Sequence, residues 1–263
     1  MITKITAKDN KKIKETVKLF SSSRYRKQSG LFVLEGVRLC TDASNSKIKI
    51  KTLFFTDDAF DRYKESISLL IENADEAYSV TNDVFAKISD TVSPQGVIAV
   101  CVMPDIESTC DKLSQNGKYI ACENVSDPSN LGAISRTAEA LGVSGMILIG
   151  NCCDPFGPKA QRASMGSMLR LPLFHFDDID AAYEHTVDKN LTLFASVVDK
   201  GAELLTDIKF KNGDIIIIGN EGNGLSDRAK ELCKRRITIP ITGRAESFNA
   251  ASAAAILMWE LMK

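Results

Sequence analysis

The stretch IIIIGNEGNGLSD, residues 215–227, joins four consecutive isoleucines to a turn with three glycines and one glutamate. A short apolar run bounded by turn residues is typical of a fully buried strand in a parallel sheet. Glycines directly after such a strand let the backbone approach a ligand closely. Because open parallel sheets bind ligands at the carboxyl ends of their strands, the stretch predicts an α/β fold with a binding loop at 219–224.

The second half of the chain repeats this alternation of strands and helices. Strand 118–122, helix 130–141 and strand 146–149 form a βαβ unit, whose two strands we expect to be parallel. Further along, the pattern predicts strands 191–198, 214–218 and 236–239 and helices 225–234 and 249–262. The ligand-facing loops of this sheet are then 123–130, 195–201, 219–224 and 240–248.

The first half of the chain predicts a smaller α/β unit. A lysine-rich amphipathic helix at 9–20, capped by Asp9, precedes strand 31–34, helix 35–44, strand 52–56, helix 58–72, strand 77–80, helix 82–88 and strand 96–103. The following residues contain a proline and no strong period. We therefore divide the chain into domain 1–103, linker 104–117 and domain 118–263.

The charge is unevenly distributed along the chain. Residues 1–51 hold 13 Lys and Arg against 4 Asp and Glu, and the remainder holds 20 against 30. A basic module on an acidic chain is typical of a polyanion-binding arm, because neutralising phosphates releases counterions. The alternative is a solvated lysine-rich helix face.

Composition argues against several classes of function. The two histidines give little support to a multi-histidine metal site or a Ser-His-Asp triad, so we expect no metal. The seven cysteines include no C-x-x-C pair and are interpreted as reduced core thiols. No apolar stretch approaches the roughly 20 residues of a membrane span. We expect a cytoplasmic protein with no membrane or DNA partner.

The segment ENVSDPSNLGAISRTAEALGV, residues 123–143, contains the first candidate site. Asn130 stands at the start of the predicted helix, and Arg136 lies about 9 Å further along its axis. Helix N-termini attract anions, and a guanidinium holds phosphate in a bidentate fork. Ser135, Arg136 and Glu139 lie off the apolar stripe and can face a ligand. The alternative is a capping Asn130 and a surface Arg136 paired with Glu139.

The loop at 219–224 is the second candidate site, and it matches neither a Walker loop nor G-x-G-x-x-G. Glu221 would repel a pyrophosphate, but it can accept hydrogen bonds from a cationic or hydroxyl-rich ligand. Gly219, Gly222 and Gly224 permit close backbone approach. The alternative is an ordinary turn with a solvated glutamate.

The segment ITIPITGRAESFNAASAAAILMWELM, residues 237–262, is the third. Ser247 and Asn249 stand at a helix start, where both are good caps, and capping alone is the alternative to a role in a site. Phe248 between them is too apolar for a free loop. The helix is apolar or small nearly all round, which predicts a core position and a partner subunit.

Together the three loops resemble the SpoU branch of the SPOUT RNA methyltransferases, also called the TrmH family. They match, in order, the family motifs N-x-G-x-x-x-R, G-x-E-x-x-G and I-P-x-x-G followed by S-x-N, at Asn130, Gly132, Arg136, Gly219, Glu221, Gly224, Ile239, Pro240, Gly243, Ser247 and Asn249. The family often reads S-L-N-V-S where this chain has SFNAAS, so Phe248 is a larger side chain than usual.

This resemblance implies S-adenosylmethionine as cofactor and a C-terminal trefoil knot that builds its pocket. The residues it assigns to cofactor binding are Gly219, Ile239 and Phe248, which act mainly through backbone groups, with Ala195, Ser196, Asn220 and Gly224. The implied reaction moves the sulfonium methyl to a ribose 2'-hydroxyl. Because a guanidinium stays protonated, we expect Arg136 to clamp phosphate, while Asn130, Glu221, Ser247 and Asn249 orient the site.

Residues 19–103 also resemble the family's accessory RNA-binding domain, which is similar to a ribosomal-protein fold. The resemblance includes LEG at 34–36 and SPQG at 93–96. A mixture of cations and an aromatic ring suits phosphate contact and base stacking, and the predicted RNA-binding residues are Arg24, Tyr25, Arg26, Lys27 and Arg38.

The partners implied are RNA, with ribosomal RNA favoured over transfer RNA, and a second copy of the chain. Two other functions stay open: an RNA-binding assembly factor without catalysis, and a nucleotide-dependent enzyme that uses 219–224 as a phosphate cradle. Glu221 and the missing lysine argue against the latter.

Overall fold

The computed structural model describes residues 2–106 and 108–263, which form two compact units. The first comprises Met1–Pro104 and Phe156–Leu169, and the second Asp105–Pro155 and Arg170–Lys263. The sequence-based division kept 156–169 inside the second domain. The segment clusters with the first unit because Phe156 packs on Phe32 with ring centroids 5.1 Å apart, and Arg162 pairs with Asp90 at 2.9 Å.

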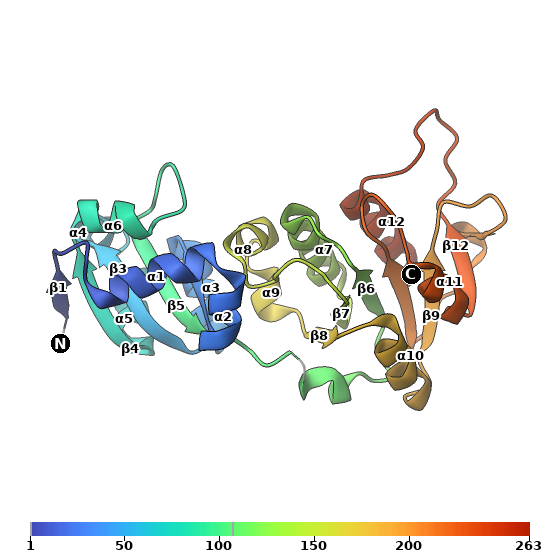
Figure 1. The fold of residues 1–263 in the computed structure, drawn as a ribbon, viewed down its shortest axis with the longest axis horizontal. Coiled ribbons are helices and arrows are strands. Elements are labelled where there is room, and N and C mark those ends of the chain that lie inside the picture. The colour runs from blue at the N-terminus through green and yellow to red at the C-terminus, as the bar shows by residue number, and fades with distance from the viewer. Residues whose placement is uncertain (1, 107) are drawn as a thin grey trace. The chain divides into compact units, whose positions relative to one another are not determined.

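The first unit contains a mixed five-stranded sheet in the order β1-β4-β3-β5-β2 (Figure 1). Strands β1, β4 and β3 are parallel, while β5 runs antiparallel to both β3 and β2. The strands are β1 (Thr3–Ile5), β2 (Leu31–Glu35), β3 (Ile50–Thr56), β4 (Ala74–Val80) and β5 (Val97–Val102).

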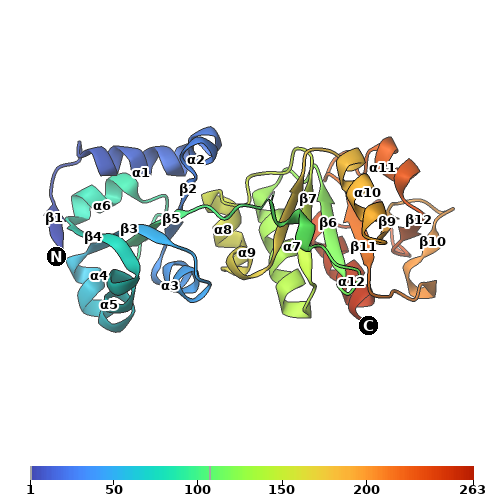
Figure 2. The same cartoon turned by 90° about the horizontal axis from the view of Figure 1, so that it is seen from below.

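Helices cover both faces of this sheet. Figure 2 shows α1 and α6 on one face and α3, α4 and α5 on the other. The helices are α1 (Lys11–Ser21), α2 (Ser23–Ser29), α3 (Val37–Asn45), α4 (Asp57–Arg62), α5 (Lys64–Asn73) and α6 (Asn82–Ile88), joined by α8 (Pro158–Ser164) and most of α9 (Ser167–Arg170). The helix expected at 58–72 is two helices that meet at Tyr63.

The predicted amphipathic helix of the N-terminal region is α1, with one change at its start. Asn10, not Asp9, is its cap, because the Asn10 side chain accepts a hydrogen bond from the Lys12 backbone N–H at 2.9 Å. Ile13 and Leu19 are buried against the sheet, and the lysines lie on the outer side. The basic character of this region therefore does not disturb its core.

Arg26 does not occupy the exposed position that its predicted RNA contact requires. It is 5% exposed, and its guanidinium donates to the carbonyl oxygens of Leu19 and Phe20 at 2.5 and 3.3 Å. These carbonyls belong to the last turn of α1, where the helix itself offers no donors. Arg26 thus binds the C-terminal end of α1, whereas Arg24 is exposed.

The second unit is built on a seven-stranded sheet in the order β10-β12-β9-β11-β6-β7-β8, and every pair in it is parallel. The α/β fold with a parallel sheet is therefore as expected. The strands are β6 (Tyr119–Glu123), β7 (Gly145–Ile149), β8 (Leu173–Phe176), β9 (Thr192–Ser196), β10 (Glu203–Leu204), β11 (Asp214–Ile218) and β12 (Arg235–Thr238).

Four helices flank this sheet. α7 (Pro128–Leu141) packs with α12 (Ala250–Met262), and α12 also contacts β11; α10 (Ile179–Asp188) packs with α11 (Asp227–Leu232). Two short 3₁₀ turns complete the unit at Ser108–Lys112 and Leu205–Asp207. Cys110 and Leu113, within the expected linker, are buried in the core of this unit.

Strand β11 is the centre of the second unit. It lies between β6 and β9, and its four isoleucines are at most 5% exposed. Its carboxyl end therefore opens between the loops that follow its two neighbours, as the opening stretch of sequence predicts. Among the described residues, no helix is long and apolar enough to cross a membrane.

The contrast between Arg26 and Arg24 gives a direct test of their positions. We expect Arg26→Met to reduce the free energy of unfolding by about 1–3 kcal/mol, because it leaves buried carbonyls of α1 without a donor. Arg24→Met is the matched control and should change it by less than about 0.5 kcal/mol. Chemical denaturation of both variants measures the difference; equal stabilities would contradict the assignment of Arg26.

Candidate active site

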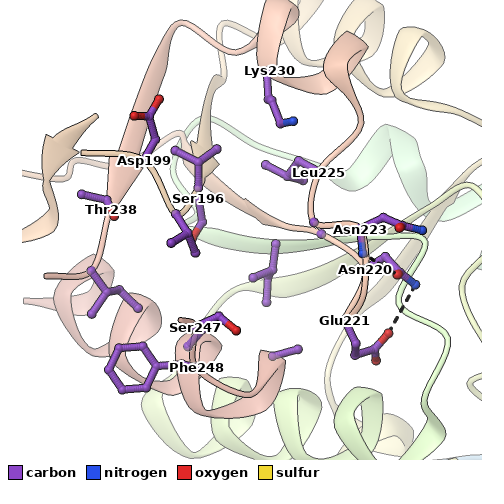
Figure 3. Close-up of a pocket in the computed structure, with 18 of the residues that line it drawn as sticks. Ser196, Asp199, Asn220, Glu221, Asn223, Leu225, Lys230, Thr238, Ser247 and Phe248 are labelled. Atoms are coloured by element: carbon purple, nitrogen blue, oxygen red, sulfur yellow. Dashed lines mark hydrogen bonds between the residues drawn. The ribbon is translucent and has the colours of Figure 1, made fainter. Parts of the chain in front are cut away.

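The carboxyl ends of β9, β11 and β12 surround a cavity of about 1080 Å³ (Figure 3). Its walls come from the residues after β9, from the glycine turn after β11, and from the segment between β12 and α12. Of the residues predicted to bind cofactor, the lining includes Ser196, Gly219, Asn220, Gly224, Ile239 and Phe248. Ala195 is fully buried within β9 and is not part of the lining.

The glycine turn is closed by its own backbone. Asn220 and Gly224 exchange two hydrogen bonds, of 3.0 and 2.9 Å, which fold the turn back on itself. A Cβ on Gly219 would lie 2.1–2.3 Å from backbone atoms of Gly224 and Leu225, so only glycine fits there. Gly224 has φ +67°, which also favours glycine.

The Asn220 side chain is used to build the turn. Its Oδ1 accepts from the backbone N–H groups of Gly222 and Asn223 at 2.9 and 3.1 Å, and its Nδ2 donates to the Asn124 carbonyl at 2.9 Å. Any contribution of Asn220 to ligand binding must therefore come mainly from its backbone.

Glu221 ties this turn to the loop before α7. Its carboxylate accepts from the Ser126 hydroxyl at 3.1 Å, from the backbone N–H groups of Ser126 and Asp127 at 3.3 and 3.2 Å, and from Asn130 Nδ2 at 3.0 Å. The glutamate is exposed yet not simply solvated, because protein donors occupy both of its oxygens. The alternative of a plain surface turn therefore does not fit.

Asn130 connects Glu221 to the start of α12. Its Nδ2 donates to Glu221, and its Oδ1 accepts from Asn249 Nδ2 at 3.0 Å. Asn249 in turn caps α12, since its Oδ1 accepts from the backbone N–H groups of Ala251 and Ser252. A carboxylate only accepts hydrogen bonds, so Glu221 fixes the orientation of the Asn130 amide, which fixes that of Asn249.

The three segments found in the sequence therefore meet through one chain of hydrogen bonds. The capping residue of α7 is Asp127, not Asn130: its carboxylate accepts from the backbone N–H groups of Ser129 and Asn130 at 2.7 and 3.0 Å. Because Asp127 takes the cap, the Asn130 side chain is free to reach across to the other two segments.

These contacts also set the ionisation of Glu221. Partial burial acts to raise the pKa of its carboxyl group, but hydrogen bonds from Asn130 and from the backbone of Asp127 and Ser126 outweigh it. The pKa of Glu221 consequently lies below its ordinary value. The side chain is an anion at neutral pH.

Arg136 is exposed on the outer side of α7, about one and two-thirds turns beyond Asn130. Its guanidinium makes no hydrogen bond or ion pair with any residue that the structure describes. Glu139 pairs instead with Arg170, whose Nη2 lies 2.8 Å from Oε2. The alternative, in which Arg136 pairs with Glu139, is therefore wrong, and Ser135 is fully buried and not available to a ligand.

Ser247 and Phe248 lie at the edge of the cavity, where Figure 3 shows them just before α12. Ser247 is exposed and lines the cavity, and Asn249 alone caps the helix. Phe248 is 42% exposed, an unusually high fraction for a phenylalanine. Its ring is a free apolar surface at the cavity mouth.

Glu123 is a buried carboxylate that sequence reasoning missed. It is 3% exposed at the carboxyl end of β6, and it accepts from the Ser226 backbone N–H at 2.9 Å and the Ser226 hydroxyl at 2.6 Å. Ser226 follows the glycine turn and caps α11. An acidic residue directly after the apolar run YIAC was the available signal.

The predicted RNA-binding residues of the first unit differ in their surroundings. Arg24, Lys27 and Arg38 are exposed. Tyr25 is half-buried against the core, and the Lys18 ammonium lies 5.6 Å from its ring centroid. One face of the Tyr25 ring is therefore already occupied within the protein.

Known families and relatives match both halves of the chain. The model of the SpoU rRNA Methylase family matches residues 117–259. The chain belongs to this family. A second model, described as an MRM3-like substrate binding domain, matches residues 10–99.

Relatives in this family match over nearly the whole chain. An uncharacterized tRNA/rRNA methyltransferase of Synechocystis is 32% identical, with 98% of this chain and 93% of the relative covered. The 23S rRNA (guanosine(2553)-2'-O)-methyltransferase RlmP of Bacillus subtilis is 28% identical, with 98% of each covered. The prediction of the SpoU/TrmH family is confirmed.

Solved structures of SpoU methyltransferases share the fold. An rRNA methyltransferase from Sinorhizobium meliloti with bound AdoMet aligns with TM-score 0.89 and 27% identity, covering 99% of this chain and 97% of its own. AviRb from Streptomyces viridochromogenes, in complex with AdoMet, aligns with TM-score 0.87 and 25% identity, covering 96% and 97%. The similarity to these structures thus covers both units.

The depressed pKa of Glu221 predicts a pH-dependent effect of its removal. Its contribution to stability is present above its unfolded pKa and is lost as the pH falls through the folded value. We expect Glu221→Gln to reduce the free energy of unfolding at pH 7 by about 1–3 kcal/mol and the melting temperature by a few degrees, because an amide cannot accept hydrogen bonds from all of these donors.

The difference between Glu221→Gln and the unaltered protein should shrink as the pH falls below the ordinary glutamate pKa of about 4.3 and through the lower folded pKa, because the carboxyl group then loses its charge. Thermal melts between pH 3.5 and 8 measure it, and Glu184→Gln, at an exposed carboxylate, is the control. A difference that stays constant across this range would contradict the ionised network.

Proposed function

We propose that this chain is an S-adenosylmethionine-dependent methyltransferase that methylates a ribose 2'-hydroxyl in RNA, with ribosomal RNA as substrate. The observation that carries this is the hydrogen-bond chain from Glu221 through Asn130 to Asn249, which joins all three family motifs beside one cavity. Support comes from relatives named as 23S rRNA 2'-O-methyltransferases and from SpoU structures with AdoMet bound.

The cavity suits a nucleoside cofactor of the size of S-adenosylmethionine. Its volume of about 1080 Å³ is slightly above the roughly 300–1000 Å³ common for small-molecule sites. The absence of a side chain at Gly219 lets the turn close on its own backbone, and Gly219, Gly222 and Gly224 line the cavity without side chains. We assign the adenosine to the backbone of Gly219, Ile239 and Phe248, with Ser196 beside them, and S-adenosylmethionine supplies an activated methyl group.

Within this proposal, the protein's own residues hold the substrate in line and stabilise charge. Asn130 is fixed by two hydrogen bonds and positions the start of α7. Arg136 carries a permanent positive charge with no partner in the described chain, which suits a phosphate of the target RNA. Ser247 is a free hydroxyl at the cavity edge that can orient the ribose. Proton removal falls to the substrate or to water, because a guanidinium does not act as a base at neutral pH.

The first unit is assigned to RNA binding. It matches the MRM3-like substrate binding domain over residues 10–99 and exposes Arg24, Lys27 and Arg38. These cations suit the phosphate backbone, which dominates affinity for nucleic acids. Transfer RNA is the second candidate substrate, since one relative is named a tRNA/rRNA methyltransferase.

The proposal includes a homodimer formed through α12. Ser252, Ile256, Trp259 and Met262 recur at helical spacing on its outer side, and Trp259 is 58% exposed. An exposed tryptophan on an apolar helix face is typical of an interface anchor.

The proposal also includes the family's trefoil knot. It is supported by the strand order, since β12 lies outside β9 while α12 returns across β11 to α7.

Arg136 gives the test of the mechanism. We expect Arg136→Gln to bind S-adenosylhomocysteine within about two-fold of the unaltered protein, because the side chain is not part of the cavity lining. Methyl transfer to ribosomal RNA should fall by about 10²–10³-fold, the usual loss for one charge-stabilising group. Calorimetry and a radioactive methyl-transfer assay measure the two quantities, with Lys209→Gln as a control for lost positive charge. Undiminished transfer would remove Arg136 from the mechanism.

Trp259 gives the test of the dimer. We expect Trp259→Glu to convert the protein to a monomer, because a carboxylate cannot be buried without a partner at an apolar interface. Sedimentation equilibrium measures the mass, and Val187→Glu, at an exposed valine of α10, is the matched control. A dimer that persists unchanged in Trp259→Glu would place the interface elsewhere.

A further inference from the structure

The charged groups of the cavity are distributed unequally. Its lining contains two cations, Lys230 and Arg236, and four carboxylates, Asp199, Glu221, Asp227 and Glu231. Figure 3 shows Asp199 and Glu221 on opposite sides of the pocket. A charged ligand group must therefore select among these side chains, and existing contacts decide which of them are available.

Most of these charges are already paired. Glu221 accepts from Ser126, Asp127 and Asn130 as described above. Lys230 pairs with Asp227 at 3.0 Å, and Glu231 lies 3.4 Å from the Arg228 guanidinium. These contacts leave little capacity for a further ionic partner.

Two charges of the lining stay available. Within residues 2–106 and 108–263, the Arg236 guanidinium has no hydrogen bond or ion pair. Asp199 accepts only from the backbone N–H of Gly201, at 2.8 Å. Its second oxygen has no donor in the described chain. The cavity therefore offers one unpaired cation and one carboxylate without a cationic partner.

These two residues belong to neighbouring strands. In the β9–β12 pair, Arg236 is in register with Ala195 and Ile237 with Ser196, and the Val197 N–H donates to the Ile237 carbonyl at 2.9 Å. Asp199 follows two residues later. Both side chains thus belong to the same border of the cavity, the one formed by the ends of β9 and β12.

The neighbouring Arg235, in contrast to Arg236, has partners within the protein. Arg235 donates from Nε to Glu203 at 2.6 Å, and its guanidinium carbon lies 5.5 Å from the Phe194 ring centroid. Alternation along β12 directs the two arginines to opposite faces of the sheet. One arginine holds the edge strand β10, and the other lines the cavity.

We propose that Arg236 and Asp199 form the subsite for the amino-acid end of the cofactor, with Arg236 on its carboxylate and Asp199 on its ammonium group. This rests on the proposed function, which supplies a ligand that carries both charges on one carbon. A guanidinium matches a carboxylate with two parallel hydrogen bonds, and Asp199 has an oxygen to spare for an ammonium donor. The apolar lining residues Ile218, Leu225, Ile239 and Phe248 remain for the adenosine.

The subsite predicts which ligand each substitution affects. S-adenosylhomocysteine carries the amino-acid group, whereas 5'-deoxy-5'-methylthioadenosine keeps the adenosine and thioether but lacks it. We expect Arg236→Gln to weaken the affinity for S-adenosylhomocysteine by about 10–100-fold, the range for a lost charge-assisted pair. Asp199→Asn should weaken the same affinity by about 10-fold. Neither substitution should change the affinity for methylthioadenosine by more than about two-fold. Lys234→Gln, an exposed cation outside the lining, is the control and should change neither affinity.

Titration calorimetry of both ligands with the full chain decides the question. Equal weakening of the two ligands by Arg236→Gln, or weakening of neither, would overturn the subsite while the proposed function stands. A higher KM for RNA with unchanged S-adenosylhomocysteine affinity would assign Arg236 to the nucleic acid and overturn it as well. If the unaltered protein binds neither ligand, the proposed function fails first and the subsite with it.

Discussion

The hydrogen bond between Asn130 and Glu221 is the contact on which the site depends. It joins a loop after the central strand β11 to the first turn of α7, and the same amide receives Asn249 from α12. Each partner restricts the next, because the carboxylate accepts only and the two amides must then point one way. Asn130 is 91 residues from Glu221 and 119 residues from Asn249 in the sequence. These contacts therefore fix the arrangement of three segments that lie far apart along the chain.

Much of this arrangement could be predicted from the sequence, because the signals were strong and local. The run IIII with its glycines located the central strand, and the second and third motifs located two walls of the cavity. The short elements were missed for physical reasons. Strands β1 and β10 have only three and two residues, and the four residues of β8, LFHF, include a histidine that interrupts the apolar run. Such segments carry too little periodicity to identify.

The errors among the predicted site residues share a cause, which is that the exposure of a side chain depends on its tertiary partners. Arg26 and Arg24 stand two residues apart in a basic stretch, yet one binds the end of α1 and the other faces solvent. Glu139 has a partner in Arg170, thirty-one residues away, so a pairing guessed from helical spacing fails. Glu123 was overlooked because nothing in the sequence shows that the Ser226 hydroxyl donates a hydrogen bond to its carboxylate.

The segment Phe156–Leu169 has a consequence for how the protein is built. It leaves the second unit, packs into the first through Phe156 and Arg162, and returns, so the backbone passes between the units three times. A single protease cut after Pro104 would leave the amino-terminal part held only by noncovalent packing against Phe156–Leu169, such as that of Phe32 on Phe156. A fragment that ends there would also lack the ring that covers Phe32. Neither unit corresponds to a continuous stretch of sequence, so a chain that ends before Phe156 lacks part of each unit.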